Sequence, residues 1–368
     1  MNEKTQPCTH CGAVHLRVNL TWMGSAELCP ECLQRYTVCC DCCGERIWMA
    51  NDYGTHYLHL CASCRADNYV TCENCGALIP QENAHYNDED EAYCDSCYER
   101  GYGGTIHNYS YKPEPIFYGD GPLYLGVELE VDEAGKDNIN AVQALRAFNQ
   151  ENVYGYVKSD GSLNDGFELV THPCTLETHL QQVPWRETLE ALRGMGYRSH
   201  APGTCGLHVH VSRKALGKDV YEQEETIAKL LYIFERFWQE ILRFSRRTES
   251  QINHWAARYG YKDRGEEILK EAKHGANGRY ACINLTNTDT IEFRVFRGTL
   301  KYNTVIATLQ FVANLCRVAI SLPEYRIQEF SWPALIEALT QDNCPELVQY
   351  LKERNLYVNE PVTAEREV

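Results

Sequence analysis

The sequence predicts an α+β protein: an antiparallel sheet covered by helices on one side and preceded by small four-cysteine zinc modules. Three observations predict this class. Residues 1–100 repeat a paired Cys-x-x-Cys pattern, several later stretches alternate apolar and charged residues with the period of a strand, and the segments between them carry helical apolar stripes. At 368 residues, the chain is long enough for two or three domains and a sizeable core.

The N-terminal repeat predicts three structural zinc sites. Its first Cys-x-x-Cys clips begin at Cys8, Cys40 and Cys72, in steps of 32 residues, and each is followed by a glycine and, 17 or 18 residues later, by a second clip. Four thiolates suit tetrahedral Zn²⁺, and the glycine suits the tight knuckle of the first clip. The twelve expected ligands are Cys8, Cys11, Cys29, Cys32, Cys40, Cys43, Cys61, Cys64, Cys72, Cys75, Cys94 and Cys97.

The use of cysteine also indicates a compartment. Of the 19 cysteines, 14 precede residue 98, and their pairing favours metal thiolates in a reducing environment over disulfides. Cys39 and Cys42 fall outside the repeat and are either spares or the basis of an alternative register. Each module is too short to bury an adequate core, so metal substitutes for one. We therefore expect about three Zn²⁺ per chain and a cytoplasmic protein.

The charge balance bears on the partners. The net charge is −16, and residues 1–100 carry 6 Lys and Arg against 15 Asp and Glu, a net of −9 to which each zinc tetrathiolate centre adds further negative charge. Nucleic-acid binding is therefore not expected, and a protein or peptide partner, or packing against the next domain, is expected instead. No apolar run is expected to span a membrane, and the first residues lack a signal-peptide core.

The remaining chain divides into a linker and one larger domain. Residues 101–117 are rich in Gly and Pro and are expected to be a linker, and residues 118–368 form the second domain. Its expected helices cover 138–150, 176–195, 220–246, 303–321, 332–340 and 345–354, and the glycine-rich segment 250–278 is expected to be a loop or flap over a substrate. Three arginines end the 220–246 helix and either complement its C-terminus or reach an anion: Arg243, Arg246 and Arg247.

Four predicted strands alternate in the same way. Residues 125–131, 166–171, 206–212 and 290–296 each place apolar side chains on one face and charged or imidazole side chains on the other. A solvated outer face is the plain alternative for any one strand. If the four share a sheet, however, one face presents Glu128, Glu130, Glu168, His208, His210, Glu292 and Arg294. Such a face suits divalent cations and an anionic substrate. Asp160, in the turn before the second strand, is a further candidate.

These motifs, in this order, resemble a known family. Gly126-x-Glu128-x-Glu130, Asp160-Gly-Ser, Gly206-x-His208-x-His210 and Glu292-x-Arg294 are similar to the catalytic domain of the glutamine synthetase superfamily. The Asn284…Asn287 hairpin and Arg297-Gly298-Thr299 resemble its amidoligase (COOH–NH2 ligase) branch, of the type seen in phage and bacterial genomes. The resemblance covers about residues 120–320.

The resemblance implies a cupped antiparallel sheet that binds ATP and two or three Mg²⁺ or Mn²⁺ ions. By position, Glu128, His208 and Glu292 look like ligands of one metal, and Glu130 and Glu168 like ligands of a second. Arg294 matches the arginine that contacts the transferred phosphoryl group or the substrate carboxylate. Asp160 is a candidate proton acceptor, and Arg297 and His210 are further catalytic candidates. The larger substrate-loop elements of true glutamine synthetases are missing.

The sequence thus predicts an ATP-dependent ligase that joins a carboxylate to an amine through an acyl phosphate. Two alternatives remain at this point. One is a metal-dependent hydrolase built on the His-x-His motif, although Ser212 stands where such enzymes have an aspartate. The other is a zinc-finger adaptor with a degenerate ligase domain, against which the retained carboxylates, histidine and arginine argue.

Overall fold

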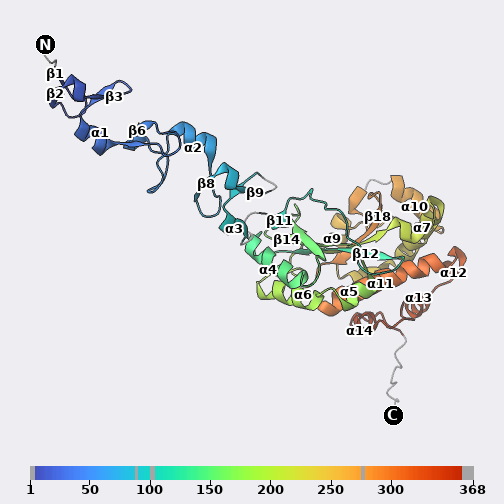
Figure 1. The fold of residues 1–368 in the computed structure, drawn as a ribbon. Coiled ribbons are helices and arrows are strands. Elements are labelled where there is room, and N and C mark those ends of the chain that lie inside the picture. Colours follow the sequence, from blue (N-terminus) through green and yellow to red (C-terminus); the bar gives the residue numbers. More distant parts are fainter. Residues whose placement is uncertain (1–4, 88–89, 100–103, 275–277, 359–368) are drawn as a thin grey trace. The chain divides into compact units, whose positions relative to one another are not determined.

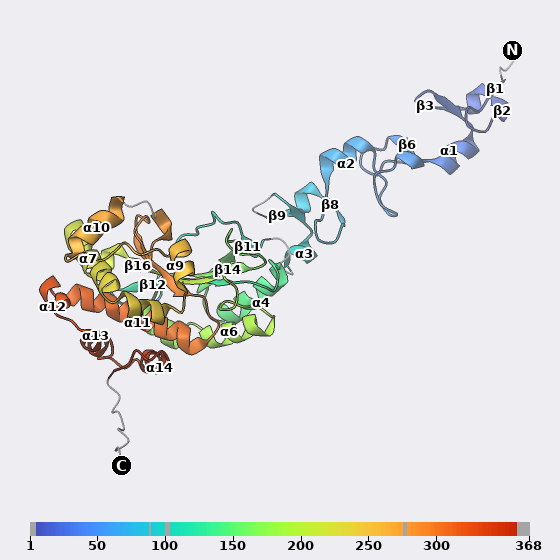
Figure 2. The same ribbon diagram turned by 180° about the vertical axis from the view of Figure 1, so that it is seen from behind.

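We analysed a computed structural model, which describes residues 5–87, 90–99, 104–274 and 278–358. The chain forms two compact units, Met1–Gly104 and Thr105–Val368. Figures 1 and 2 show the elements of each unit from two sides. The two units are described separately below.

The first unit consists of three similar modules. Each one has a short antiparallel hairpin that carries the first clip and a helix that begins at the second clip. The hairpins are β1–β2 (Thr5–Pro7, Val14–Leu16), β5–β6 (Thr37–Cys39, Arg46–Trp48) and β7–β8 (Tyr69–Thr71, Leu78–Pro80), and the helices are α1 (Pro30–Tyr36), α2 (Ala62–Asn68) and α3 (Asp95–Glu99). The shorter elements are β3 (Thr21–Met23), β4 (Ala26–Leu28), β9 (His85–Tyr86), β10 (Ala92–Tyr93) and the 3-10 turns η1 (Arg17–Asn19), η2 (Met49–Asn51) and η3 (Gln81–Asn83).

The modules have very small cores. The buried core of the second module consists of Cys40, Cys61 and Cys64 together with Ile47 and Leu60, and the other two modules are built alike. The glycine after each first clip has a φ between 70 and 76°, in the left-handed region, as the expected knuckle requires. Apolar burial on this scale stabilises a module only weakly, which is why a bound metal is needed.

The second unit is built on an eight-stranded sheet. Its strands run in the order β11-β13-β14-β12-β16-β18-β17, with β15 pairing β12, and all pairs are antiparallel except β11 with β13. The strands are β11 (Ile106–His107), β12 (Tyr124–Val131), β13 (Gly155–Lys158), β14 (Phe167–Thr171), β15 (Cys174–Thr175), β16 (Gly206–Ser212), β17 (Ile283–Asn284) and β18 (Thr290–Arg297). This is the predicted α+β class.

Helices form the rest of the second unit, some packed on the sheet and others packed on those helices. They are α4 (Asn138–Phe148), α5 (Leu176–Gln181), α6 (Trp185–Gly194), α7 (Val220–Arg236), α8 (Trp238–Ser245), α9 (Glu249–Trp255), α10 (Gly265–His274), α11 (Tyr302–Ser321), α12 (Glu324–Gln328), α13 (Trp332–Leu339) and α14 (Pro345–Glu353), with 3-10 turns η4 (Arg213–Leu216) and η5 (Gly278–Tyr280). One core holds the alternating residues of the central strands, such as Leu129, Val209 and Phe293, each completely buried. The period-two interpretation of these strands is therefore confirmed.

One helix of this core has the length and composition of a membrane span. α11 passes that test, which the sequence analysis did not anticipate, but 83% of its apolar window is buried inside the protein. It packs against α7, α13 and α14. Its hydrophobicity on all sides is that of a helix at the centre of a folded core.

The segment expected as a linker differs in the structure. Residues 101–103 lie outside the described residues, but Thr105 onwards belongs to the second unit. There β11 adds a parallel edge strand beside β13, and the Ile116 amide faces His172 Nδ1 at 3.4 Å. The Gly and Pro content of 101–117 predicted a linker, but residues 106–107 of this segment form a strand at the sheet edge.

Other boundaries also differ. The segment 250–278 contains α9 and α10 rather than a loop, because Ile252, Ile268 and Leu269 bury an apolar stripe that the neighbouring glycines concealed. Pro184, which has no amide hydrogen, divides the expected 176–195 helix into α5 and α6. The 220–246 helix is divided at Phe237 into α7 and α8.

Candidate functional site

The register of the sheet brings the polar side chains of the central strands together. Glu128 of β12 lies opposite His208 of β16, and Glu130 of β12 lies opposite Glu168 of β14. His210 of β16 lies opposite Glu292 of β18. Because directly opposed residues in an antiparallel pair share a face, these cross-strand pairs gather the predicted residues into one cluster.

The two histidines lie within a few ångströms of the carboxylates. His208 Nδ1 is 3.4 Å from Glu128, 3.8 Å from Glu130 and 3.5 Å from Glu292, measured to the nearest carboxylate oxygen. His210 Nε2 is 3.2 Å from Glu128 and 3.9 Å from Glu292. Four glutamates and two imidazoles therefore share one small, largely buried volume.

Two groups of three side chains within this cluster have the spacing of metal ligands. The ligand atoms of Glu128, His210 and Glu292 lie within 4.8 Å of one another, and so do those of Glu128, Glu168 and His208. The sequence-based assignment had grouped His208 with Glu292 and Glu168 with Glu130. In the structure, Glu128 is common to both groups. Its strand, β12, lies between β14 and β16, so its carboxylate can reach side chains of both neighbouring strands.

The electrostatics of the cluster fit a divalent cation. Burial, followed by the charge of Glu128, raises the pKa of Glu168 well above its usual value. Burial likewise raises the pKa of Glu130. Burial also disfavours the ionised form of Glu128, but the two histidines outweigh it and hold its pKa well below the usual range. So much negative charge in a desolvated place calls for a compensating cation.

The imidazole of His210 is oriented for such a role. Its Nδ1 pairs with the Thr290 hydroxyl at 3.3 Å, whereas its buried Nε2 makes no hydrogen bond of normal geometry within the described residues. That nitrogen points towards Glu128 and Glu292. A metal-binding imidazole is usually held in this way, through its second nitrogen.

Gly206 makes room for the other imidazole. A Cβ at this position would lie 2.3 Å from His208 Nε2 and 2.9 Å from Arg247 Nη2, so the imidazole and the guanidinium would have to move. The amide of Gly206 also donates to the Glu130 carboxylate. The glycine of the Gly-x-His motif is therefore explained by close packing beside the cluster.

Arginines border the cluster at the end of β18. Arg294 forms an ion pair with Glu292, whose other oxygen accepts a hydrogen bond of 2.8 Å from the Asn284 amide. The buried Arg247 donates to the carbonyl of Phe296, and its Nε and Nη1 have no partner in the described part of the chain. Arg297 lies at the strand end, opposite Gly206.

Asp160 lies in the turn between β13 and β14. Its Oδ1 accepts hydrogen bonds from the amide and the hydroxyl of Ser162, which explains the Asp-Gly-Ser pattern as a turn. Its charge contributes to the raised pKa values of Glu130 and Glu168. The carboxylate of Asp160 therefore lies near this end of the cluster.

Two further features of the site escaped the sequence analysis. Lys158 of β13 is almost fully buried and pairs with Glu168 at 3.3 Å, and the alternation of β13 was the signal that could have found it. The Lys158 ammonium also lies over the ring of Tyr109, 5.6 Å from its centre, and the Tyr109 hydroxyl accepts a hydrogen bond from Arg279. Residues 105–111 had been assigned to a linker, so their contact with the site was not foreseen.

The cysteines of the first unit form the three predicted clusters. In each, the four Sγ atoms lie within 4.8 Å of one another, in the expected groups of two clips. Burial opposes ionisation of Cys8, Cys40 and Cys72, yet backbone amide donors lower the pKa of each to about 6. Thiolates at such spacing suit tetrahedral Zn²⁺. Cys42 lies beside the second cluster, where it accepts a hydrogen bond from Asn68.

A comparison with protein families finds a match within the second unit. Residues 146–316 match the family described as "Putative amidoligase enzyme". The matched segment includes Glu168, His208, His210, Glu292 and Arg294, and it begins after the strand that carries Glu128 and Glu130. This part of the chain is therefore similar to the amidoligase family.

Solved structures and curated proteins were compared as well. A bifunctional glutathione synthetase from Pasteurella multocida aligns with a TM-score of 0.31 and 15% identity, over 63% of this chain and 46% of that one. The ligase PafA, in complex with the prokaryotic ubiquitin-like protein Pup, aligns with a TM-score of 0.31 and 10% identity, over 63% of this chain and 62% of that one. The chain thus spans less than two thirds of both. No curated protein matches the chain.

Proposed function

We propose that the protein is an ATP-dependent ligase that forms an amide or peptide bond between a carboxylate and an amine. The observation that carries this proposal is the largely buried cluster of four glutamates and two histidines, in which Glu168, Glu292 and both histidines belong to the segment that matches the amidoligase family. A metal-dependent hydrolase and a non-catalytic adaptor are the alternatives that the experiment below distinguishes.

The residues of the cluster would hold Mg²⁺ or Mn²⁺ together with ATP. Glu128 belongs to two ligand sets that suit hard divalent cations. One set adds His210 and Glu292, and the other adds Glu168 and His208. Glu130, which lies opposite Glu168, adds a further carboxylate to the cluster. Divalent cations bound there would neutralise the phosphate charge of ATP, and they would relieve the repulsion that raises the pKa of Glu168.

The reaction proceeds in two balanced steps. First, an oxygen of the donor carboxylate attacks the γ-phosphorus of ATP, the bond to the β-phosphate oxygen breaks, and an acyl phosphate and ADP result. Then the amine attacks the acyl carbon and inorganic phosphate leaves with the bonding electrons. The guanidinium of Arg294, paired with Glu292, would stabilise the negative charge on the transferring phosphoryl group, whereas Arg297 lines a separate pocket.

The amine must also lose a proton in the second step. Asp160 is the proposed acceptor, because it lies at the end of the cluster and its carboxylate is otherwise occupied only by its own turn. Lys158, between Glu168 and Tyr109, would help to hold the donor carboxylate or a phosphate oxygen.

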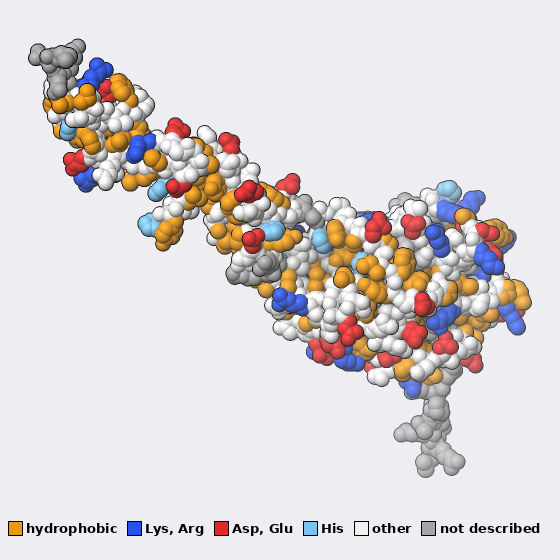
Figure 3. All heavy atoms as spheres, viewed as in Figure 1, with side chains coloured by type: hydrophobic (Ala, Val, Ile, Leu, Met, Phe, Trp, Pro, Cys, Tyr) orange, Lys and Arg blue, Asp and Glu red, His pale blue; other side chains and the backbone are white. Residues whose placement is uncertain are grey.

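The zinc modules are proposed to engage a protein or peptide partner in the cytoplasm. They are acidic, with a net of −9 over residues 1–100, and they expose large apolar side chains, including Val18, Trp22 and Tyr57. Figure 3 shows the hydrophobic side chains of this unit at its surface. An acidic surface with exposed aromatic groups suits a peptide better than a phosphate backbone.

The test of the proposed reaction is nucleotide binding. Calorimetry of the full chain should show ATP binding that requires Mg²⁺ or Mn²⁺, and the Glu130→Ala, Glu292→Ala double variant should lose it. With a suitable carboxylate and amine, ADP and phosphate should appear in step with the amide. Release of AMP and pyrophosphate would contradict the acyl phosphate. If the wild-type protein binds no nucleotide with either metal, the hydrolase or the adaptor is the better interpretation.

A further inference from the structure

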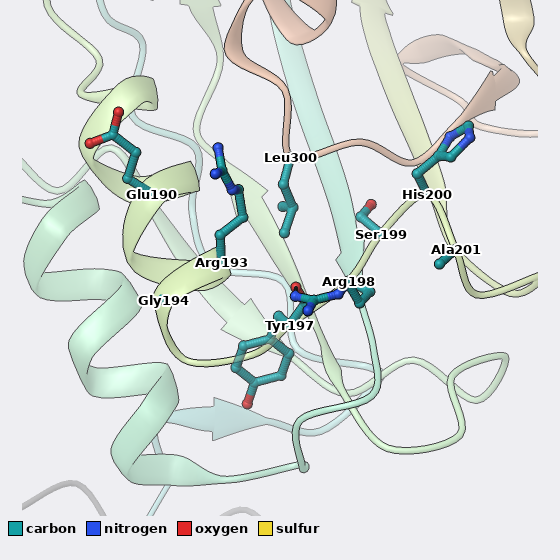
Figure 4. Close-up of a pocket in the computed structure, with 9 residues that line it drawn as sticks. All are labelled: Glu190, Arg193, Gly194, Tyr197, Arg198, Ser199, His200, Ala201 and Leu300. Atoms are coloured by element: carbon teal, nitrogen blue, oxygen red, sulfur yellow. Dashed lines mark hydrogen bonds between the residues drawn. The ribbon is translucent and has the colours of Figure 1, made fainter.

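A large basic pocket lies among the helices near the end of β18. It has a volume of about 950 Å³ and is lined by α6, α14 and the segment 297–304. A smaller pocket of about 630 Å³ adjoins it and shares Glu190, Arg193, His200 and Leu300 with it. Figure 4 shows this smaller part, which is formed by α6, the segment that follows it and Leu300.

The lining of the large pocket is rich in cations although the chain is acidic. It contains Arg186, Arg193, Arg246, Arg297, Lys301 and Arg354 against Glu190, Glu346 and Glu353. Two of these acids already have partners: Glu353 pairs with Lys301 at 2.8 Å, and Glu346 accepts a hydrogen bond from Gln310 at 2.8 Å. An excess of guanidinium groups therefore faces the cavity.

Several of these guanidiniums have no counter-ion. Within the described residues, Arg193 and Arg297 make no ion pair, and the buried Nε of Arg297 has no hydrogen-bond partner. Arg246 contacts the Tyr350 hydroxyl and donates to the backbone carbonyls of Arg297 and Gly298, but it makes no ion pair within the described residues, and its Nε is also unpartnered. Arg246 and Arg297 are half-buried, whereas Arg186 and Arg193 are exposed at the mouth of the pocket. A partly desolvated guanidinium without a counter-ion is stabilised when an anion joins it.

The positive charges around the pocket lower the pKa values of neighbouring basic groups. After burial, the charges of Arg297, Arg246 and Arg354 lower the pKa of His200. Burial lowers the pKa of Arg246, and the charges of Arg354 and Arg297 add to this effect. The arginines are therefore close enough to repel one another across the cavity.

A backbone turn at Arg246 directs two consecutive arginines to different places, the pocket and the carboxylate cluster. Arg246 has a φ of 65°, and it reaches the pocket. The next residue, Arg247, lies instead beside Gly206 and His208. Two consecutive arginines thus serve two different places, and the carboxylates of the cluster do not line the pocket.

We propose that this pocket is a binding site for a ligand with at least two oxyanion groups, either phosphates or carboxylates. Arg193 and Arg297 would each receive one group as a guanidinium–oxyanion pair, and Arg186, which now lies 4.0 Å over the ring of Tyr302, would assist. The volume accommodates a small molecule of this kind. The site does not depend on the ligase reaction proposed above.

The experiment uses calorimetry of the zinc-loaded full chain without Mg²⁺ or Mn²⁺. The probes are pyrophosphate, for the phosphate class, and tricarballylate, for the carboxylate class. At least one should bind, and the Arg186→Gln, Arg193→Gln double variant should weaken it by about 10-fold or more, since a hydrogen-bonded charge pair is worth about 1.5–3 kcal/mol. The preferred probe identifies the ligand class.

Two controls make the result decisive. The Arg264→Gln, Arg326→Gln variant loses the same charge from exposed arginines elsewhere, and it should keep the wild-type affinity. Binding of Mn²⁺ to the carboxylate cluster should be unchanged in both variants. The proposal is overturned if neither probe binds the wild-type protein, or if both double variants weaken binding equally, because a general charge effect would then suffice.

Discussion

At the scale of single residues, the candidate site is defined by which side chains face one another across the sheet. Glu128 is its centre, because it contacts both histidines and belongs to both ligand sets. Its strand neighbours on the opposite face, Val127 and Leu129, are completely buried and hold the strand in register. Chemistry and stability are therefore divided between alternate residues of one strand.

This division predicts the behaviour of Glu128→Gln. The amide has nearly the same shape and empties no part of the core, so the melting temperature should change by only a few degrees, roughly the effect of about 1 kcal/mol. The affinity for Mn²⁺ should fall more than about 100-fold, since even the loss of an outer-shell partner costs about 10–100-fold. Calorimetry and thermal melting measure the two effects. Glu177→Gln, on the exposed face of α5, is the charge-matched control, and an unfolded Glu128 variant would indicate a structural role instead.

Glu168 predicts a pH dependence of metal binding. Its pKa is raised well above the usual value by burial and by Glu128, so in the metal-free protein it keeps its proton at a higher pH than an exposed glutamate does. A cation must displace that proton. Affinity for Mn²⁺ should therefore fall as the pH is lowered through the raised pKa of Glu168, with proton release on binding. Calorimetry in two buffers of different ionisation enthalpy counts the protons. Glu168→Gln should bind more weakly but release fewer protons, and unchanged release would assign the proton to another group.

At the scale of elements, sequence periodicity was most informative where one face of a strand is buried. The four strands with charged alternation were predicted because their apolar faces, such as Ile291, Phe293 and Val295, repeat with period two. β11 could not be predicted in the same way, since it has two residues at a sheet edge. Lys158 was missed because one lysine in a four-residue strand is ordinary until its neighbours in space are known. The grouping of ligands depends on strand order, which local patterns do not contain.

The position of β11 predicts how the second unit tolerates truncation. A fragment that begins at residue 105 keeps β11 and Tyr109, whereas one that begins at residue 118 removes the partner of β13 and uncovers Lys158. The longer fragment should melt cooperatively and bind Mn²⁺ like the full chain. The shorter fragment should melt at a lower temperature, because it exposes a sheet edge and loses the packing of His107 and Tyr111 against Tyr156. Equal melting of the two fragments would show that residues 105–117 act as a linker.

At the scale of the whole molecule, two means of stabilisation coexist in one chain. The second unit has a continuous apolar core that includes α11. Each zinc module has only a few buried residues besides its cysteines. The modules must therefore obtain their stability from metal binding, which contributes about 10–16 kcal/mol per site in zinc-finger peptides. The second unit needs no metal for its fold, although a bound cation would relieve the repulsion in its carboxylate cluster.

This contrast predicts that the two metal requirements can be separated by experiment. Elemental analysis of the washed protein should give about three Zn²⁺ per chain, one for each four-cysteine cluster. A thiol-reactive reagent should release the zinc ions, and a zinc-sensitive dye should detect them. Hydrogen exchange should then show unprotected amides in residues 5–99, while the strands β12, β16 and β18 stay protected. Replacing Cys40 and Cys43 by serine should lower the zinc content by about one, because thiolates are needed to close the second site. Replacing Cys174 and Cys316, buried cysteines of the second unit, should leave it unchanged. Zinc content near zero in the purified protein, with the cysteines paired as disulfides, would contradict both the metal assignment and the expected reducing compartment.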